Sequence, residues 1–182
     1  MGTIRREVRS NPMTPQRPNV ESPKRNAQLN PDWIVGFIDG EGCFHIGTSK
    51  HPQVRFGHQI LPELTVVQHQ RDIALLHRIR STMNCGVVRR NHGERFCWRV
   101  RDLKNLAEVI VPFFESHPLH SKKAIEFRKF ARVVRKMAKG DHLTERGFHE
   151  ICQIASTMNR GEPREILGLR ESPCPDENRG NP

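Results

Sequence analysis

Apolar and polar residues recur with two different periods along residues 30–160 of the chain. Apolar residues three and four positions apart predict helices over about 32–42, 72–84, 102–113, 121–134 and 144–158. Strict alternation predicts strands over 43–50, 59–68, 87–91 and 95–101, the last two joined as a hairpin. Because this order requires no parallel crossover, we expect an α+β fold: a four-stranded antiparallel sheet with helices on one face and additional C-terminal helices.

Polar residues mark where the predicted helices begin. The first helix is expected to be capped by Asn30 or Asp32, and the later helices by Asp72, Asp102, Ser121 and Thr144. Within the second strand, Pro62 predicts either a bulge or an unpaired backbone position, because proline has no N–H to donate.

The two ends of the chain contain few apolar residues. Residues 1–29 combine prolines with Arg and Lys, which predicts a disordered basic arm that either contacts phosphates or stays solvated. A transit peptide is a weaker alternative, since the prolines would disrupt an amphipathic helix. Residues 161–182 are expected to form a disordered tail, which leaves residues 30–160 as one domain.

The formal net charge of +10 and the pI near 10.0 narrow the class of partner. Lys and Arg are spread over the whole chain, which favours a polyanion such as nucleic acid. A membrane fits less well, because the sequence has no apolar run of about 18 residues and no signal-peptide core. We expect an intracellular protein, in the bacterial cytoplasm or nucleoid or else in an organelle.

The segment WIVGFIDGEG, residues 33–42, contains most of the candidate chemistry. Gly36 and Gly40 lie four apart, which clears one helix stripe of side chains and lets another backbone come close. Each glycine inside a helix costs about 1 kcal/mol relative to alanine, so we favour close packing of this stripe on a second helix. Asp39 and Glu41 follow near the helix C-terminus, where carboxylates require a metal or another cation. The alternative is a buried helix with a glycine-rich cap.

Residues 34–42, IVGFIDGEG, closely resemble the core motif of the LAGLIDADG homing endonucleases. The resemblance covers about residues 30–160 and includes the segments ELTVVQH (63–69), VPFF (111–114), PL (118–119) and KK (122–123). HLT (142–144) and MN (158–159) are similar to the branch of the family that has one motif per chain. The family's αββαββα fold has the same order of elements as the periodicity predicts.

The resemblance implies an activity as well as a fold. It implies an intron-encoded, site-specific endonuclease that cuts both strands of double-stranded DNA at a long pseudo-palindromic site. The implied cofactor is Mg²⁺ or another divalent cation such as Mn²⁺. An RNA maturase, with host intron RNA as a partner, and a non-catalytic DNA-binding regulator on the same fold are the alternatives.

The resemblance also implies the active-site residues. Glu41 stands at the position of the family's metal-binding acid, with the Gly40 carbonyl beside it, and Gln68 at the position that orders water. Asp39 is turned about 200° around the helix from Glu41, so we interpret it as structural.

The family's catalytic lysine corresponds to the segment 119–123, where this chain has extra residues. Lys122 is our first choice. Lys123 and His120 remain alternatives.

Alternation in the predicted sheet leaves one face polar and rich in Arg. Such a face can lie in the DNA major groove, where Arg reads guanine, Gln or Asn reads adenine, and Thr or Ser reads either. The alternative is a solvated face without a ligand. The candidate DNA contacts are His45, Ser49, Gln59, Glu63, Thr65, Arg89, Asn91, Arg95 and Arg99.

The motif occurs once in the chain, so its glycine stripe has no internal partner. We therefore expect a homodimer joined through the motif helices, with Gly36 and Gly40 at the interface. A two-fold axis there brings the two copies of Glu41 together, and it predicts a palindromic or pseudo-palindromic target.

Overall fold

The computed structural model describes residues 28–159 of the chain. Its elements are α1 (Pro31–Glu41), β1 (Gly42–Lys50), β2 (His58–His69), a 3₁₀ turn (Gln70–Asp72), α2 (Ile73–Met83), β3 (Val87–Arg90), β4 (Arg95–Val100), α3 (Leu103–Asn105), a π-helical turn (Leu106–Ile110), α4 (Val111–Ser116), α5 (Lys123–Ala138), a second 3₁₀ turn (Asp141–Leu143) and α6 (Glu145–Ser156). The predicted tail and nearly all of the predicted arm lie outside the described residues.

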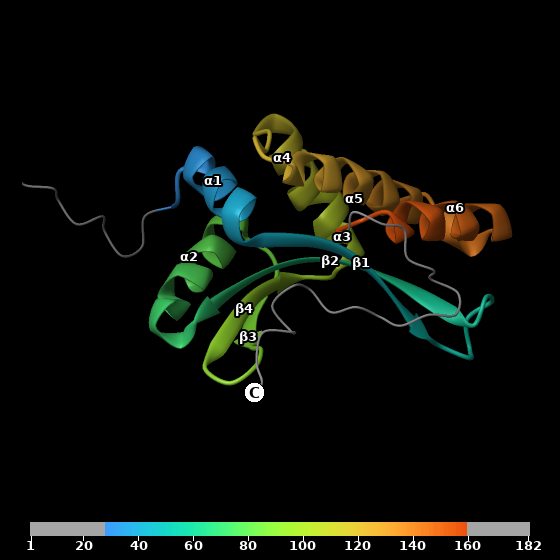
Figure 1. Ribbon diagram of the computed structural model, residues 1–182, viewed down its shortest axis with the longest axis horizontal. Helices are drawn as coiled ribbons and strands as arrows, with labels where there is room; N and C mark the ends of the chain where they lie inside the picture. The colour runs from blue at the N-terminus through green and yellow to red at the C-terminus, as the bar shows by residue number, and fades with distance from the viewer. Residues whose placement is uncertain (1–27, 160–182) are drawn as a thin grey trace, which may run out of the picture.

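The four strands form one antiparallel sheet in the order β1-β2-β4-β3. Helices α4, α5 and α6 lie along one side of this sheet, and α1 and α2 lie at one end of it (Figure 1). The expected α+β fold is therefore confirmed. The register runs without interruption through Pro62, which lies opposite Ile46, so the bulge considered for this position is not formed.

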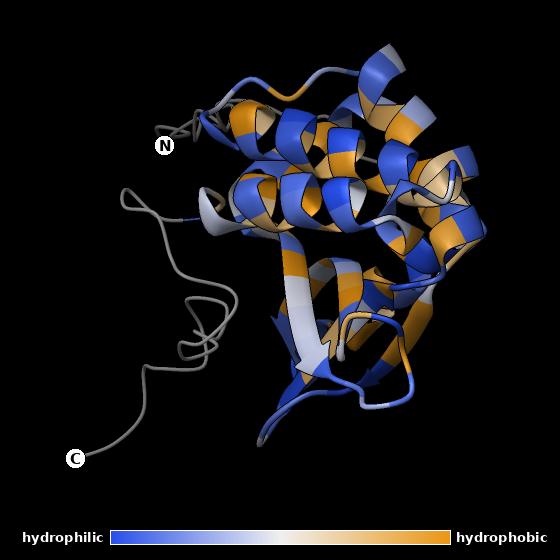
Figure 2. Ribbon diagram, turned by 90° about the vertical axis from the view of Figure 1, so that its right-hand side faces the viewer, coloured by the Kyte–Doolittle hydropathy of each residue, from blue (hydrophilic) through white to orange (hydrophobic). Residues whose placement is uncertain are grey.

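Aromatic side chains hold the helices on the sheet. Phe44 of β1 is fully buried, and its ring centroid lies 5.3 Å from that of Phe127, 5.3 Å from that of Phe130 and 5.5 Å from that of Phe114. The helices above the sheet carry alternating hydrophobic and hydrophilic bands, as amphipathic helices on a core must (Figure 2). Residue 29, assigned to the arm from sequence, belongs to this core: Leu29 is 8% exposed.

Most of the predicted N-caps are present. Asn30, Asp102 and Thr144 each accept a backbone N–H from the first turn of their helix. The N-cap position of α5 is Lys122, one residue after the predicted Ser121, but the Ser121 hydroxyl still accepts the N–H of Lys123 at 3.1 Å. Asp72 is the exception, because a 3₁₀ turn precedes α2 and the Asp72 side chain makes no capping bond.

The helix predicted over 102–113 is interrupted. Within it, the N–H of Val111 bonds to the carbonyl of Leu106, five residues back, which widens the helix by one residue. Pro112 follows immediately and has no N–H for an ordinary helical bond. Within residues 28–159, none of the helices combines the length and the apolar composition needed to cross a bilayer.

Candidate functional site

Buried side chains fix α1 to the core of the domain, and the end of the helix leads directly into β1. Ile34, Val35 and Ile38 are its buried residues, and Glu41 ends the helix exposed to solvent. Gly42 turns the chain into β1, and a Cβ there would lie 2.6 Å from a side-chain atom of Ile38 and 2.8 Å from its carbonyl oxygen. The glycine therefore permits a turn that places Glu41 at the junction of α1 and the sheet.

Asp39 connects this junction to the segment before α5. Its carboxylate accepts the backbone N–H groups of His120 at 2.8 Å and of Ser121 at 2.9 Å, and the Ser121 hydroxyl at 2.6 Å. Burial acts to raise the pKa of Asp39, but these hydrogen bonds and the nearby Lys123 charge outweigh it, so the pKa lies below its usual value. This geometry fits the structural role we inferred for Asp39 from the sequence.

Lys123, in the first turn of α5, lies against the same helix end. Its ammonium donates to the carbonyl of Ile38 at 2.9 Å and to the carbonyl of Gly40 at 3.2 Å. Burial lowers the pKa of the Lys123 ammonium, and the nearby thiol and carboxylates only partly offset this. Lys123 thus brings a positive charge to the two carbonyls that flank Asp39.

The other two candidates for the lysine position lie differently. Lys122 is exposed, and its ammonium makes no hydrogen bond or ion pair within residues 28–159. His120 is exposed and contributes its backbone N–H to Asp39. Of the three candidates, Lys123 is the one whose side chain donates hydrogen bonds to the end of α1 within residues 28–159.

Gln68 lies near the same end of the sheet. The β1–β2 ladder ends where Gly42 pairs with Val66, so Gln68, two residues further along β2, extends past β1 towards α1. Gln68 lies three residues after Thr65 on β2, so its side chain points to the opposite face of the sheet, the face shared by its cross-strand partner Phe96. The Gln68 side chain is half-buried. Gln68 can therefore reach the surroundings of the α1 end without belonging to the polar face.

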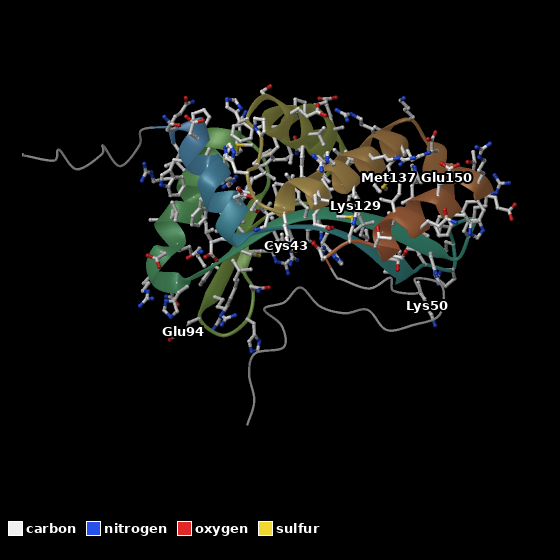
Figure 3. The ribbon with its side chains drawn as sticks, turned by 45° about the horizontal axis from the view of Figure 1, so that its top comes forward. Cys43, Lys50, Glu94, Lys129, Met137 and Glu150 are labelled. Carbon is white, nitrogen blue, oxygen red and sulfur yellow. The ribbon has the colours of Figure 1, made fainter. Side chains whose placement is uncertain are left out.

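The polar sheet face extends from the tip of the β3–β4 hairpin to the tip of the β1–β2 hairpin. Figure 3 shows Glu94 at the first tip, Lys50 near the second, and Cys43 between them beside the end of α1. Among the predicted DNA contacts, Gln59, Arg89, Asn91 and Arg95 are exposed and His45 and Ser49 are half-buried. These six residues can contact a ligand that covers the face.

The other three predicted contacts are largely covered. Glu63 and Thr65 are 8% and 7% exposed, and the Arg99 side chain is 18% exposed. Alternation assigned them to the correct face, but their neighbours on that face hide them. The same cluster includes Arg101, which we did not select from the sequence although the alternation puts it on this face; its side chain is 53% exposed and pairs with Glu63.

Known proteins resemble this chain in sequence and in fold. The family model of the LAGLIDADG endonucleases matches residues 34–134. The chain belongs to the LAGLIDADG endonuclease family.

Individual relatives support the assignment. A probable intron-encoded endonuclease of Neurospora crassa is 31% identical over 74% of this chain and 30% of its own length. The crystal structure of the homing endonuclease I-TnaI is 47% identical, with a TM-score of 0.71 over 75% of this chain and 92% of that chain. The structure of I-SmaMI bound to cleaved DNA is 28% identical, with a TM-score of 0.73 over 78% of this chain and 48% of that chain. The chain spans only 30%, 26% and 37% of three curated relatives that it matches.

One face of the LAGLIDADG helix α1 is not packed against any other part of residues 28–159. A Cβ placed on Gly36 or on Gly40 would meet no atom within 4 Å. On the same helix Trp33 is 42% exposed, and its ring stacks on Phe37 with centroids 5.0 Å apart. The glycine stripe therefore opens outward and does not pack inside the domain.

The residues at the α1 end of this LAGLIDADG domain fit a hydrated divalent cation. Mg²⁺ keeps several waters and takes one or two carboxylates, with substrate phosphates completing its shell. The Glu41 carboxylate and the Gly40 carbonyl provide such oxygens at an exposed edge. Within residues 28–159, no cluster of three His, Cys, Asp or Glu side chains could enclose a metal, so an all-protein zinc-type site is not formed there.

Proposed function

We propose that the chain is an intron-encoded, site-specific endonuclease that cuts both strands of double-stranded DNA and requires Mg²⁺ or Mn²⁺. The observation that supports this most strongly is the meeting of Glu41, the Gly40 carbonyl and the Lys123 ammonium at the end of α1, beside a cationic sheet face. The family name and the relatives named as intron-encoded endonucleases agree with it. The protein would act in the cellular compartment that contains the intron's DNA.

Hydrolysis of a phosphodiester needs an activated water and neutralisation of charge on the phosphate. Glu41 and the Gly40 carbonyl would hold a divalent cation, which lowers the pKa of water and polarises the phosphate. I-SmaMI, a structural neighbour, was solved on uncleaved DNA in the presence of calcium ions. Gln68 would orient water near the α1 end.

A lysine would stabilise negative charge that develops on the phosphate. Lys122, our first choice from the sequence, remains a candidate because it is exposed one residue before the start of α5. Lys123 is now the favoured candidate, since its ammonium already lies at the Gly40 carbonyl and its burial strengthens the field that it exerts.

We propose that the polar sheet face lies in the DNA major groove. Arg89, Arg95 and Asn91 on the β3–β4 hairpin are exposed, and they are of the types that read guanine and adenine there. Gln59, Ser49 and His45 extend the same face along β1 and β2. The arginines and lysines outside this face would contact phosphates, which position the protein without reading sequence.

We propose that two copies of the chain join through α1. Gly36 and Gly40 open outward, so a second α1 can pack on them closely, beside the exposed Trp33. The match to I-TnaI, over 92% of a chain named as a homing endonuclease, supports one motif domain per subunit. A two-fold axis along α1 would place one Glu41 at each DNA strand and align two polar faces on a pseudo-palindromic site.

Incubation of the protein with Mg²⁺ and a duplex carrying the intronless junction of the host gene tests this proposal. We expect cleavage of both strands at the junction and none when EDTA replaces Mg²⁺. Binding without cleavage under all divalent cations would support the regulator instead. Faster splicing of the host intron RNA, with no DNA cleavage, would support the maturase.

A further inference from the structure

A buried carboxylate lies in the middle of the cationic sheet face. Glu63 on β2 has a side chain that is only 10% exposed. Its Oε1 receives the Thr65 hydroxyl and lies 3.1 Å from Nε of Arg99, and its Oε2 receives Nε of Arg101. A carboxylate removed from water is stable only where cations and hydrogen bonds replace the solvent. These four side chains, the Glu63 cluster, therefore depend on one another.

The strand register determines how the cluster forms. Thr65 pairs with Arg99 across β2 and β4. The same antiparallel register continued by two residues puts Arg101, one residue past the end of β4, opposite Glu63. Side chains two apart on a strand point to the same face, so all four project from the polar side of the sheet. Without Glu63, Arg99 and Arg101 would be two like charges on one strand face.

The ion pairs determine which atoms of the arginines remain for a ligand. Both arginines approach Glu63 through Nε, and Nε of Arg99 is attracted by charge alone, because it is not aligned for a hydrogen bond. The two terminal amino groups of a guanidinium are sufficient for a bidentate contact with O6 and N7 of guanine. Arg101 is 53% exposed against 18% for Arg99, so Arg101 is the member that can reach a base edge.

We propose that Glu63 is a positioning residue for base recognition, which holds Arg101 with its terminal amino groups directed outward to read one guanine of the target. This inference rests on the proposed function, because it requires the sheet face to lie in the major groove. Fixing the guanidinium in advance reduces the entropy that is lost when it binds. Glu63 itself does not contact cytosine, since both of its oxygens are occupied and it lies beneath the surface.

Selection of bound sequences from a pool of randomised duplex DNA tests the proposal on the full chain. We would compare the wild type with E63Q, R101K and E94Q. R101K keeps the positive charge but removes the planar guanidinium group that makes the bidentate contact. E94Q is the matched control: it also removes a carboxylate that contacts another side chain of this sheet, His69 Nε2 at 3.0 Å, but at the exposed hairpin tip.

We expect E63Q and R101K to relax the preference for guanine at the same target position, by roughly 5- to 150-fold in relative binding. E94Q should keep the wild-type preference everywhere. The double variant E63Q/R101K should be no more relaxed than R101K, because Glu63 acts through Arg101. If E63Q does not fold, as judged by its thermal unfolding, E63D replaces it; the shorter side chain keeps the charge but cannot hold both arginines.

Two patterns of altered selection would overturn the inference. One is a uniform loss of binding by the Glu63 variant across all sequences, which is the signature of a purely structural residue. The other is relaxation at a position different from that affected by R101K. If the wild type enriches no sequence at all, the proposed function fails and the inference with it. If the wild type selects a target and the Glu63 variant selects the same one equally well, only the inference fails.

Discussion

The carboxylate of Asp39 at the end of α1 accepts both the hydroxyl of Ser121, at 2.6 Å, and its backbone N–H, at 2.9 Å. The same hydroxyl accepts the N–H of Lys123 at 3.1 Å. Asp39 and Ser121 therefore join the last turn of α1 to the first turn of α5 through a continuous hydrogen-bonded chain. The position of the Lys123 ammonium at the Gly40 carbonyl depends on this junction.

Replacement of Asp39 by alanine should loosen that junction. Hydrogen bonds to a charged group contribute about 1.5–3 kcal/mol when buried, but Asp39 is solvent-accessible, so we expect a loss of about 1–2 kcal/mol in the free energy of unfolding. Urea unfolding of D39A, S121A and the double variant measures it. Because the two residues share their hydrogen bonds, the double variant should lose less than the sum of the single losses. Additive losses would mean that the two residues act separately.

The sequence predicts the sheet well because the alternation is carried by large side chains. Phe44, Ile46 and Leu64 can only point to the covered face, so their neighbours are directed to the other face. The motif at the end of α1 is equally clear, because two glycines and two acids destabilise an apolar helix unless a second helix and a cation compensate for them. The polar face and the position of Glu41 at a helix end thus follow from the chain alone.

Other features depend on contacts that no local pattern contains. Alternation assigns Glu63 to the polar face but does not show that Arg99 on β4 and Arg101 just past it, more than thirty residues away, will cover it. The segment around Lys122 and Lys123 also could not be predicted from a local pattern, because only the packing of α5 on α1 decides which ammonium reaches the Gly40 carbonyl. The π-helical turn had a local signal in Pro112, which we did not use.

Glu41→Gln should separate cleavage from binding. Glutamine keeps the size of the side chain but removes the charge that would hold the divalent cation, and Glu41 is exposed, so the fold should not change. We expect cleavage to fall by more than about 100-fold, since even residues that only support a metal ligand cost 10- to 100-fold. Affinity for the target, measured in Ca²⁺, should stay within about threefold. Cleavage at the wild-type rate would exclude Glu41 from the active site.

Lys123→Met and Lys122→Met distinguish the two candidate lysines. Methionine retains most of the apolar stem and removes the charge. We expect K123M to reduce the cleavage rate at saturating Mg²⁺ by about 10²–10³-fold, the usual cost of losing one stabilising group at a developing charge. K122M should change the rate by less than about threefold, because its ammonium extends into solvent. If K122M lost more of the cleavage rate than K123M in single-turnover assays, Lys122 would again be the favoured catalytic lysine.

Binding to DNA should weaken steeply as salt increases. The net charge of +10 is spread over the whole chain, and each phosphate contact releases counterions, with a slope of about −0.9 per contact in a plot of log affinity against log salt. Lys50→Gln, at the exposed end of β1 next to Ser49, should reduce this slope by about one without changing base preference, because a lysine beside the polar face can contact a phosphate but cannot reach a base. Arg128→Gln is the control, because Arg128 is exposed on α5, in the helical layer. Equal effects of both variants would contradict the assignment of the sheet face to DNA.

Gly36→Leu tests the homodimer without disturbing the subunit. A Cβ at Gly36 meets no atom within 4 Å in the described domain, so a larger side chain there should leave the thermal unfolding of the monomer nearly unchanged. In a dimer joined through α1 the same side chain would separate the two helices, and we expect dimer formation and double-strand cleavage to decrease together. Light scattering on the protein with its target DNA, combined with a nicking assay, measures both.

Gly42→Ala is the opposite case and serves as the control for Gly36→Leu. Its Cβ would lie 2.6 Å from Cγ2 of Ile38 inside the subunit, so it should cost about 1–3 kcal/mol of folding stability through overpacking. Destabilisation by G42A together with loss of the dimer in G36L would show that the two glycines serve different surfaces, one packed within the domain and one left open for a partner. A G36L protein that remains dimeric and cuts both strands at the wild-type rate would contradict an interface along this stripe.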